Sequence, residues 1–139
     1  MRTLWKQAIA LVLAATAAVA PATASLGATR PVWFYDPGHH SWCWITGPRY
    51  AGTHRIPDST GAMCENKAGH VRVFLDDHGK IRTDRYWYAP GPAPLLRYGH
   101  SVTAWGFRLT SERAGMLVVV AHTGHGFLIT PSGRVVREG

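Results

Sequence analysis

Cysteine is scarce in this 139-residue chain, which contains only Cys43 and Cys64. Two cysteines cannot complete a four-cysteine zinc site, and their spacing is not the C-x-x-C spacing of redox motifs. In an oxidising export compartment, an isolated pair most simply forms one disulfide. The chain-entropy model assigns about 3 kcal/mol of stabilisation to a loop of this length. We therefore expect a Cys43–Cys64 disulfide that stabilises a small domain.

Long apolar segments are also few. An apolar run from Ala8 to Ala20 follows two basic residues and is too short to span a bilayer comfortably. This arrangement is typical of a secretory signal peptide, and the small-x-small rule places the cleavage site after Ala24. The longest later run has only strand length. We therefore expect a signal peptide over residues 1–24 and a secreted, extracellular domain over residues 25–139, with no membrane span after cleavage.

Acidic residues are also few. The chain contains 8 Asp and Glu and 15 Lys and Arg, which gives a formal net charge of +7. A surface of this sign favours anionic partners such as a cell-wall polymer or an acidic secreted protein. The basic residues are spread along the chain without the run that marks a nucleic-acid patch, so we do not expect nucleic acid as a partner. The alternative is a charge that serves solubility alone.

No segment carries the apolar stripe of an amphipathic helix. Short stretches rich in β-branched and aromatic residues alternate instead with glycine and proline, which is typical of strands joined by turns. We expect hairpin turns at Asp76–Gly79 and Pro131–Gly133, where glycine supplies a positive φ. The expected strands cover residues 32–35, 41–45, 71–75, 85–88, 102–109, 116–121, 126–130 and 134–137.

One sequence pattern occurs twice. Residues 61–70 contain Gly-Ala-Met-Cys and then Gly-His, and residues 115–125 contain Gly-Met-Leu-Val and then Gly-His. Each copy continues to a Gly-basic-apolar turn, which indicates one β-unit used twice. The proline-rich residues 89–94 cannot donate to a strand ladder and are expected to connect the units. The predicted fold is all-β, a small sandwich or barrel, with units over residues 32–88 and 95–137 of one domain.

Four motifs follow one another along the mature chain: Phe34-x-x-Pro37 with Cys43 six residues later, Tyr-Gly-His-Ser at 98–101, Gly-Phe-Arg-Leu-Thr-Ser at 106–111 and Thr-Gly-His-Gly-Phe at 123–127. In combination they resemble a family of small exported actinobacterial proteins, catalogued as domain of unknown function 6636. Residues 38–40, Gly-His-His, stand where the family has Ser-Gly-Asn. Because the family is uncharacterised, the resemblance implies no reaction.

The second cysteine pair of that family is absent from this chain. The resemblance places the pair at Leu109 and Val118. Two apolar side chains can replace a disulfide if both are buried and adjacent, because burial of Leu and Val contributes about 1.5–3 kcal/mol each. Alternation along the expected strand 102–109 also places Leu109 on the core face, together with Trp105 and Phe107. We expect the C-terminal unit to be the less stable half.

Aromatic residues provide the main functional prediction. Trp42 and Trp44 flank Cys43, so alternation puts both tryptophans on the strand face away from the disulfide. Exposed tryptophans beside arginine can stack on the sugars of a wall polymer or contact a protein partner. The alternative is that both sheet faces are covered and the rings are ordinary core. The predicted binding residues are Trp42, Trp44, Arg49, Tyr86, Trp87 and Tyr88.

The eight histidines suggest a second hypothesis, a metal-dependent hydrolase. His122 and His125 form a His-x-x-His pair, and Asp77 would add a carboxylate ligand. The signal is weak because a turn does not fix the two rings as a helix does, and a histidine that binds backbone groups is the alternative. A third hypothesis is an inhibitor of a secreted enzyme, which would present residues 48–59. For the binding domain itself, we expect no cofactor and no catalytic residue.

Overall fold

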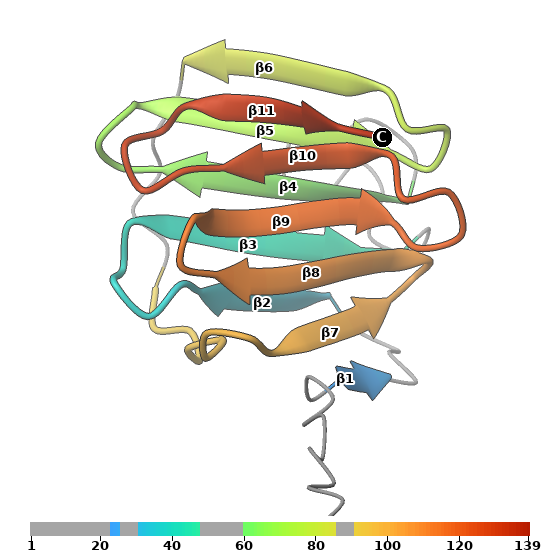
Figure 1. Cartoon of the computed structure of the whole chain (residues 1–139), viewed down its shortest axis with the longest axis horizontal. Helices are drawn as coiled ribbons and strands as arrows, with labels where there is room; N and C mark the ends of the chain where they lie inside the picture. The colour runs from blue at the N-terminus through green and yellow to red at the C-terminus, as the bar shows by residue number, and fades with distance from the viewer. Residues whose placement is uncertain (1–22, 26–30, 48–59, 86–90) are drawn as a thin grey trace, which may run out of the picture.

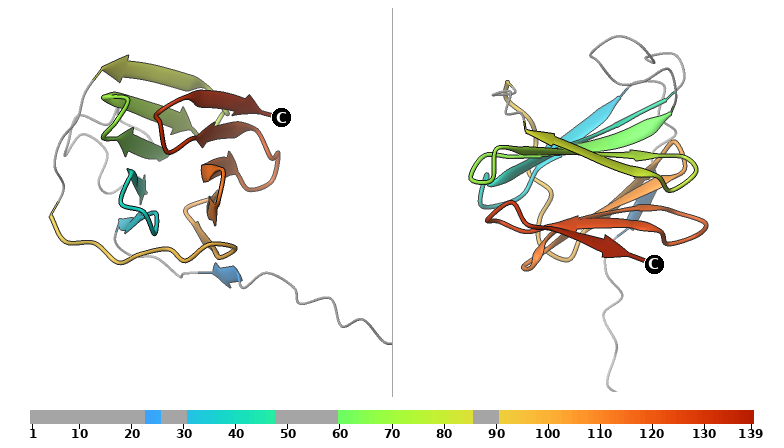
Figure 2. Two further views of the ribbon diagram at one scale, coloured as in Figure 1. Left: turned by 60° about the vertical axis from the view of Figure 1, so that its left-hand side comes forward. Right: turned by 90° about the horizontal axis from the view of Figure 1, so that it is seen from above.

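The computed structural model describes residues 23–25, 31–47, 60–85 and 91–139, and these residues contain strands and turns but no helix. No helix able to cross a membrane therefore occurs in this part of the chain. Two sheets pack face to face, so the fold is the predicted all-β sandwich (Figure 1, Figure 2). The strands are β1 (Thr23–Ser25), β2 (Val32–Tyr35), β3 (Ser41–Thr46), β4 (Gly61–Asn66), β5 (Val71–Asp76), β6 (Ile81–Arg85), β7 (Ser101–Ala104), β8 (Phe107–Glu112), β9 (Gly115–Val120), β10 (Gly126–Ile129) and β11 (Val135–Glu138).

Each sheet contains five consecutive strands of the chain. The first sheet has the order β2-β3-β4-β5-β6, with every neighbouring pair antiparallel. The second sheet has the order β7-β8-β9-β10-β11, also antiparallel, and β1 adds in parallel to the free edge of β7. The two sheets run in the same order, and equivalent strands point in opposite directions (Figure 1). The chain changes sheet between β6 and β7.

The two sheets use equivalent cross-strand pairs in the core. Cys43 of β3 lies directly opposite Cys64 of β4, and Leu109 of β8 lies directly opposite Val118 of β9. The side chains of Leu109 and Val118 are 0% and 1% exposed. Leu109 and Val118 are therefore adjacent and buried, which is the condition under which two apolar side chains can stand in place of a disulfide.

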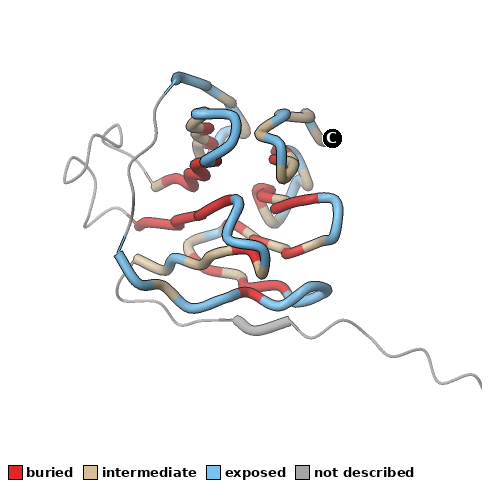
Figure 3. Tube along the Cα trace, turned by 90° about the vertical axis from the view of Figure 1, so that its left-hand side faces the viewer, coloured by how far each residue is buried: buried red, intermediate tan, exposed pale blue. Residues whose placement is uncertain are grey.

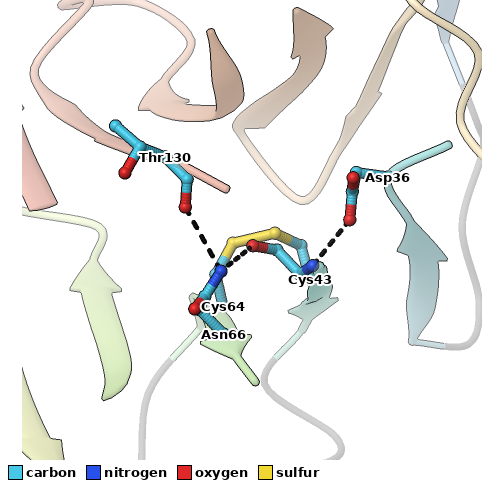
Figure 4. Close-up of a disulfide and its surroundings, with 6 residues drawn as sticks. Asp36, Cys43, Cys64, Asn66 and Thr130 are labelled. Atoms are coloured by element: carbon cyan, nitrogen blue, oxygen red, sulfur yellow. Dashed lines mark hydrogen bonds between the residues drawn. A yellow bond between two sulfur atoms is a disulfide. The ribbon is translucent and has the colours of Figure 1, made fainter. Parts of the chain in front are cut away.

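The predicted disulfide joins Cys43 to Cys64 in the first sheet (Figure 4). The two Cα atoms are 4.1 Å apart, and both side chains are buried. The disulfide belongs to the core between the sheets, which alternate residues of both sheets supply. The other buried members of this core are Ile45, Ala62, Val73, Leu75, Leu96, Val102, Ala104, Phe107, Leu109, Met116, Val118, Val120, Phe127 and Ile129.

Asn66 connects the two sheets through its side-chain amide. The residue is fully buried at the end of β4, and its Nδ2 donates to the carbonyl oxygens of Thr130 (3.2 Å) and Pro131 (3.1 Å) (Figure 4). Nδ2 also lies 3.0 Å from Ser41 Oγ, and Oδ1 accepts from the Gly69 N–H at 2.8 Å. A buried amide with these partners fixes the β10–β11 turn against the first sheet.

Turns of the two sheets touch at both ends of the sandwich. A Cβ on Gly69 would lie 2.8 Å from the Cα of Gly133, so the β4–β5 and β10–β11 turns pack backbone against backbone. At the other end, a Cβ on Gly79 would lie 3.4 Å from the Cβ of His125, which joins the β5–β6 and β9–β10 turns. In each contact, the last turn of one unit packs against the second-to-last turn of the other unit. This exchange is the pattern of a two-fold axis between the units.

The expected strand over residues 102–109 is wrong. The chain turns there between β7 and β8, because Trp105 and Gly106 have φ values of 53° and 81°. Two consecutive positive φ values are typical of a type I′ hairpin turn. Trp105 is therefore a turn residue, whereas Leu109 points into the core as expected.

Other boundaries differ from the sequence prediction as well. The list of expected strands lacks β1, β4 and most of β6, and the strand expected over residues 85–88 shares only Arg85 with β6. Residues 86–88 lie outside the described part of the chain. The turns expected at Asp76–Gly79 and Pro131–Gly133 are confirmed, with φ values of 80° at Gly79 and 88° at Gly133.

The end of the proline-rich connector extends the first sheet at β2. The Tyr35 N–H donates to the Pro94 carbonyl, and the Leu96 N–H donates to the Tyr35 carbonyl, both at 2.9 Å. Tyr35 and Leu95 form a parallel bridge. These bonds attach the connector to the end of β2, so the connector is part of the fold as well as the link between its units.

Candidate binding face

The strands β3 and β4 are buried at every residue (Figure 3). One side of each strand faces the core between the sheets, and the other faces away from the second sheet. Burial on both sides is unusual in a simple sandwich, where the side of each sheet that faces away from the core is normally solvated. We call this side of the first sheet the outer aromatic face. It is formed by Trp33, Tyr35, Trp42, Trp44, Met63, Glu65, Arg72, Phe74, Arg82 and Asp84.

Two rows of side chains cross the outer aromatic face from β2 to β6. Directly opposed residues in antiparallel strands share a face and have Cβ atoms about 4.5–5.5 Å apart, so each row is continuous. Both rows begin with aromatic residues and end with charged ones. The first row is Trp33, Trp44, Met63, Phe74 and Arg82, and the second is Tyr35, Trp42, Glu65, Arg72 and Asp84.

Trp42 and Trp44 lie on the side away from the disulfide, as alternation predicts. Their ring centroids are 6.0 Å apart, and they form a buried cluster with Met63. The two tryptophans are only 9% and 8% exposed, so the expectation of exposed rings at these positions is wrong. One reason is that Ala93, from the connector, packs against the cluster from outside the sheet.

The exposed aromatic surface comes from Trp33 instead. Its side chain is 42% exposed, and it lies directly opposite Trp44 at the end of the first row. Leu95, which bridges to Tyr35, is 47% exposed. A large aromatic ring exposed at a sheet edge is available for stacking.

Two arginines lie over the ring of Phe74 at the charged end of the face. The guanidinium carbons of Arg72 and Arg82 are 4.9 and 5.7 Å from the ring centroid, which is within cation–π range. Arg72 also pairs with Asp84, with Nε 3.0 Å from Oδ1. Arg82 is exposed, and no carboxylate of the described residues pairs with it. Its charge is therefore available to a ligand.

Glu65 places a buried carboxylate in the second row, where it is only 2% exposed. Burial raises the pKa of the Tyr35 hydroxyl, and the negative charge of Glu65 raises it further, because both effects destabilise the phenolate. Glu65 follows Cys64 in the first sheet, and Val119 follows Val118 at the equivalent position of the second sheet. A sandwich of this kind therefore does not require an acid at that position.

Sequence reasoning located only part of the outer aromatic face. Arg49 and residues 86–88, Tyr-Trp-Tyr, lie outside the described residues, so their binding role stays a prediction. Trp33, Phe74 and Arg82 were missed. Alternation within residues 71–75 puts Phe74 on the side of Arg72, away from Val73, and this signal would have found Phe74. Residues 32–35 are all apolar, so alternation does not assign a side to Trp33.

The metal hypothesis places ligands in two exposed turns. His122 and His125 lie in the β9–β10 turn, where the His125 N–H donates to Thr123 Oγ1 at 3.2 Å. Asp77 lies in the β5–β6 turn, and its Oδ1 is 3.6 Å from His78 Nε2. The described residues bring no three His, Cys, Asp or Glu side chains together in a metal-binding group.

A second polar group orders the β2–β3 turn. The buried carboxylate of Asp36 accepts from the backbone N–H groups of Gly38 (3.1 Å) and Ser41 (2.6 Å). It also lies 3.0 Å from Nδ1 of His40, whose side chain is half-exposed. These bonds replace the ladder bonds that the turn cannot make, which is the usual role of Asp in a turn.

Comparison of the chain with protein-family models, curated proteins and solved structures finds no match. The resemblance to domain of unknown function 6636 therefore stays a prediction from the motifs. What supports a function is the chemistry of the outer aromatic face.

Proposed function

We propose that this chain is a secreted, non-catalytic binding domain whose outer aromatic face binds an anionic carbohydrate polymer outside the cell. Aromatic rings stack on the apolar faces of sugars, and a guanidinium group binds carboxylate or phosphate. Trp33 and Arg82 provide these two groups at opposite ends of one cross-strand row. The row therefore offers sugar stacking at one end and anion binding at the other.

The difference between the two outer faces is the observation that carries the proposal. Both sheets use the same inner register, yet only the first combines aromatic residues with arginines on its outer side, whereas the described residues of the second include Arg108 there and no aromatic residue. The counterparts of Trp44, Phe74 and Arg82 in the second sheet are Thr110, Leu128 and Val136. Trp33 and Arg82 are exposed on this side, so packing does not impose them, and a ligand is the natural reason for them.

The charge and the disulfide are consistent with this role. The domain over residues 25–139 lacks Arg2 and Lys6 and has a net charge of +5, which attracts a polyanion over a distance of about a Debye length, ~8–10 Å at physiological salt. A disulfide in a domain this small is typical of an oxidising, extracellular compartment. The predicted signal peptide would bring the chain to that compartment.

Affinity electrophoresis of residues 25–139 tests the proposal. Gels containing polygalacturonate, a carboxylated polymer, are expected to retard the protein, and retardation should weaken with added salt. Gels containing neutral dextran should have little effect. A salt-insensitive one-to-one complex with a secreted enzyme, together with no polymer binding, would contradict the proposal and favour the inhibitor hypothesis.

Two variants and one control assign the binding to the outer aromatic face. Trp33→Ala and Arg82→Ala are each expected to weaken binding about tenfold, equivalent to about 1.4 kcal/mol. Arg108→Ala removes the same charge from the outer side of the second sheet and should leave affinity within about twofold. An equal loss in all three variants would mean that net charge alone binds the polymer.

A further inference from the structure

The edges of the two sheets are protected in different ways. At β2, backbone bonds from residues 94–96 pair with Tyr35 at the end of the strand. The edge strand β6 carries Arg82, Asp84 and Arg85, and the edge strand β11 carries Arg137 and Glu138. Charged side chains on an edge strand disfavour the addition of another strand. The edges at β6 and β11 are therefore protected by charge.

The edge of β7 has neither charges nor a permanent cover. Its sequence is Ser-Val-Thr-Ala, and three of its four residues are buried. The strand β1 occupies this edge, with Thr23 opposite Ser101 and Ser25 opposite Thr103 in a parallel register. The backbone of β7 thus accepts an extended, parallel strand with small side chains.

The predicted signal-peptidase site lies inside β1. Cleavage after Ala24 removes two of the three residues that pair with β7 and leaves only Ser25. A single residue cannot maintain a strand pairing, so the mature domain presents an uncharged and unpaired edge. Removal of the signal peptide therefore vacates a strand position that the precursor fills.

We propose that the β7 edge of the mature domain binds an extended peptide segment of a partner protein, which adds in parallel to β7 in place of β1. Main-chain hydrogen bonds supply the affinity in this mode of recognition, and side-chain pockets supply the specificity. The residues that fill the position in the precursor are Thr, Ala and Ser, so the segment is expected to be rich in small residues. This site lies in the second sheet, apart from the outer aromatic face.

A partner peptide fits the observations better than a second copy of this chain. Two copies related by a two-fold axis would pair their β7 strands in antiparallel fashion, whereas the strand observed at this edge is parallel. Each copy of residues 25–139 also has a net charge of +5, and like charges oppose association. The edge itself carries no charge that would reject a neutral peptide.

Two forms of the chain test the proposal directly. Residues 21–139 retain β1, and residues 25–139 correspond to the mature chain. A fluorescent peptide with the sequence of residues 21–27, Pro-Ala-Thr-Ala-Ser-Leu-Gly, serves as the probe. Fluorescence anisotropy should show at least about tenfold tighter binding to 25–139, because β1 competes for the same edge in the longer form. Equal binding to both forms, or binding to neither, would overturn the proposal.

A matched pair of variants locates the peptide. Thr103→Lys puts a charge on β7 and is expected to reduce peptide binding at least tenfold. Leu117→Lys puts the same charge on the same side of the second sheet at β9, away from the edge, and should retain binding. Melting curves verify that both variants fold. Equal loss in the two variants, or a dimer of 25–139 in sedimentation that 21–139 does not form, would contradict a partner peptide at β7.

Discussion

The first and second sheets resemble each other where they meet and differ where they face away. In the core, Cys43 pairs with Cys64 and Leu109 pairs with Val118 at equivalent positions, so a covalent bond and an apolar contact occupy the same cross-strand site. Close packing restricts these inner positions to side chains of suitable size. A cross-link is one way to satisfy that restriction, and burial of two aliphatic side chains is another.

The outer sides of the same strands have diverged much further. In the first sheet Glu65 is buried among aromatic residues, and its counterpart in the second sheet is Val119. Both residues point away from the opposite sheet, but both are buried, so packing on the outer side constrains them as well. At the exposed positions Trp33 and Arg82, function is the better explanation of the difference. Variants that exchange features between the sheets measure how far each difference matters.

The largest effect is expected from removal of the disulfide. The double variant Cys43→Ala with Cys64→Ala loses the cross-link and part of the buried volume, which should cost about 3–5 kcal/mol of unfolding free energy. Urea denaturation monitored by tryptophan fluorescence measures the loss. A cost below about 1 kcal/mol would show that the first sheet does not need its disulfide for stability.

The reverse exchange should strengthen the second sheet. Leu109→Cys with Val118→Cys is expected to form a second disulfide, because the two positions are directly opposed and buried. Oxidation should stabilise this variant by about 2–3 kcal/mol relative to the same pair left as thiols. Thiol titration and the melting temperature test the result. Two thiols that remain free under oxidising conditions would show that the register of β8 on β9 is wrong.

Asn66 of the first sheet and Val120 of the second sheet occupy equivalent positions. The variant Asn66→Val therefore places the residue of the second sheet in the first. The change removes the donor to the carbonyls of Thr130 and Pro131 and the acceptor for the Gly69 N–H. Buried backbone groups without partners should cost about 2 kcal/mol. Val120→Ala, which removes only apolar contacts, is the comparison. If Asn66→Val unfolds at the same urea concentration as the unaltered chain, the amide does not hold the sheets together.

The smallest effect concerns pH. Because burial and Glu65 raise the pKa of Tyr35 above its ordinary value of 10.0, the folded state holds the phenolic proton more tightly than the unfolded state. This contribution to stability is complete below pH 10 and is lost as the pH rises through the pKa of the folded state. Tyr35→Phe should therefore flatten the decline in melting temperature above pH 10. A decline of unchanged slope would contradict this assignment.

Features that depend on local periodicity were predictable from the sequence. Alternation with a period of two identified the inward position of Leu109 and the shared side of Trp42 and Trp44. The turn at Trp105 was not predictable, because the Trp105–Gly106 pair lies among β-branched and aromatic residues and lacks the usual Asn-Gly signal. The burial of the tryptophans was not predictable either, since Ala93 covers them from a distant part of the chain.

The exchange of turn contacts between the units has a consequence for how such a chain evolves. A five-stranded half alone would expose its apolar inner side, and only a second half can cover it. Two such halves around a two-fold axis have the geometry of a homodimer, here contained in a single polypeptide. In a homodimer every substitution appears on both outer faces, whereas in a fused pair each substitution appears once. Fusion therefore allows one face to acquire aromatic residues beside arginines while the other has none.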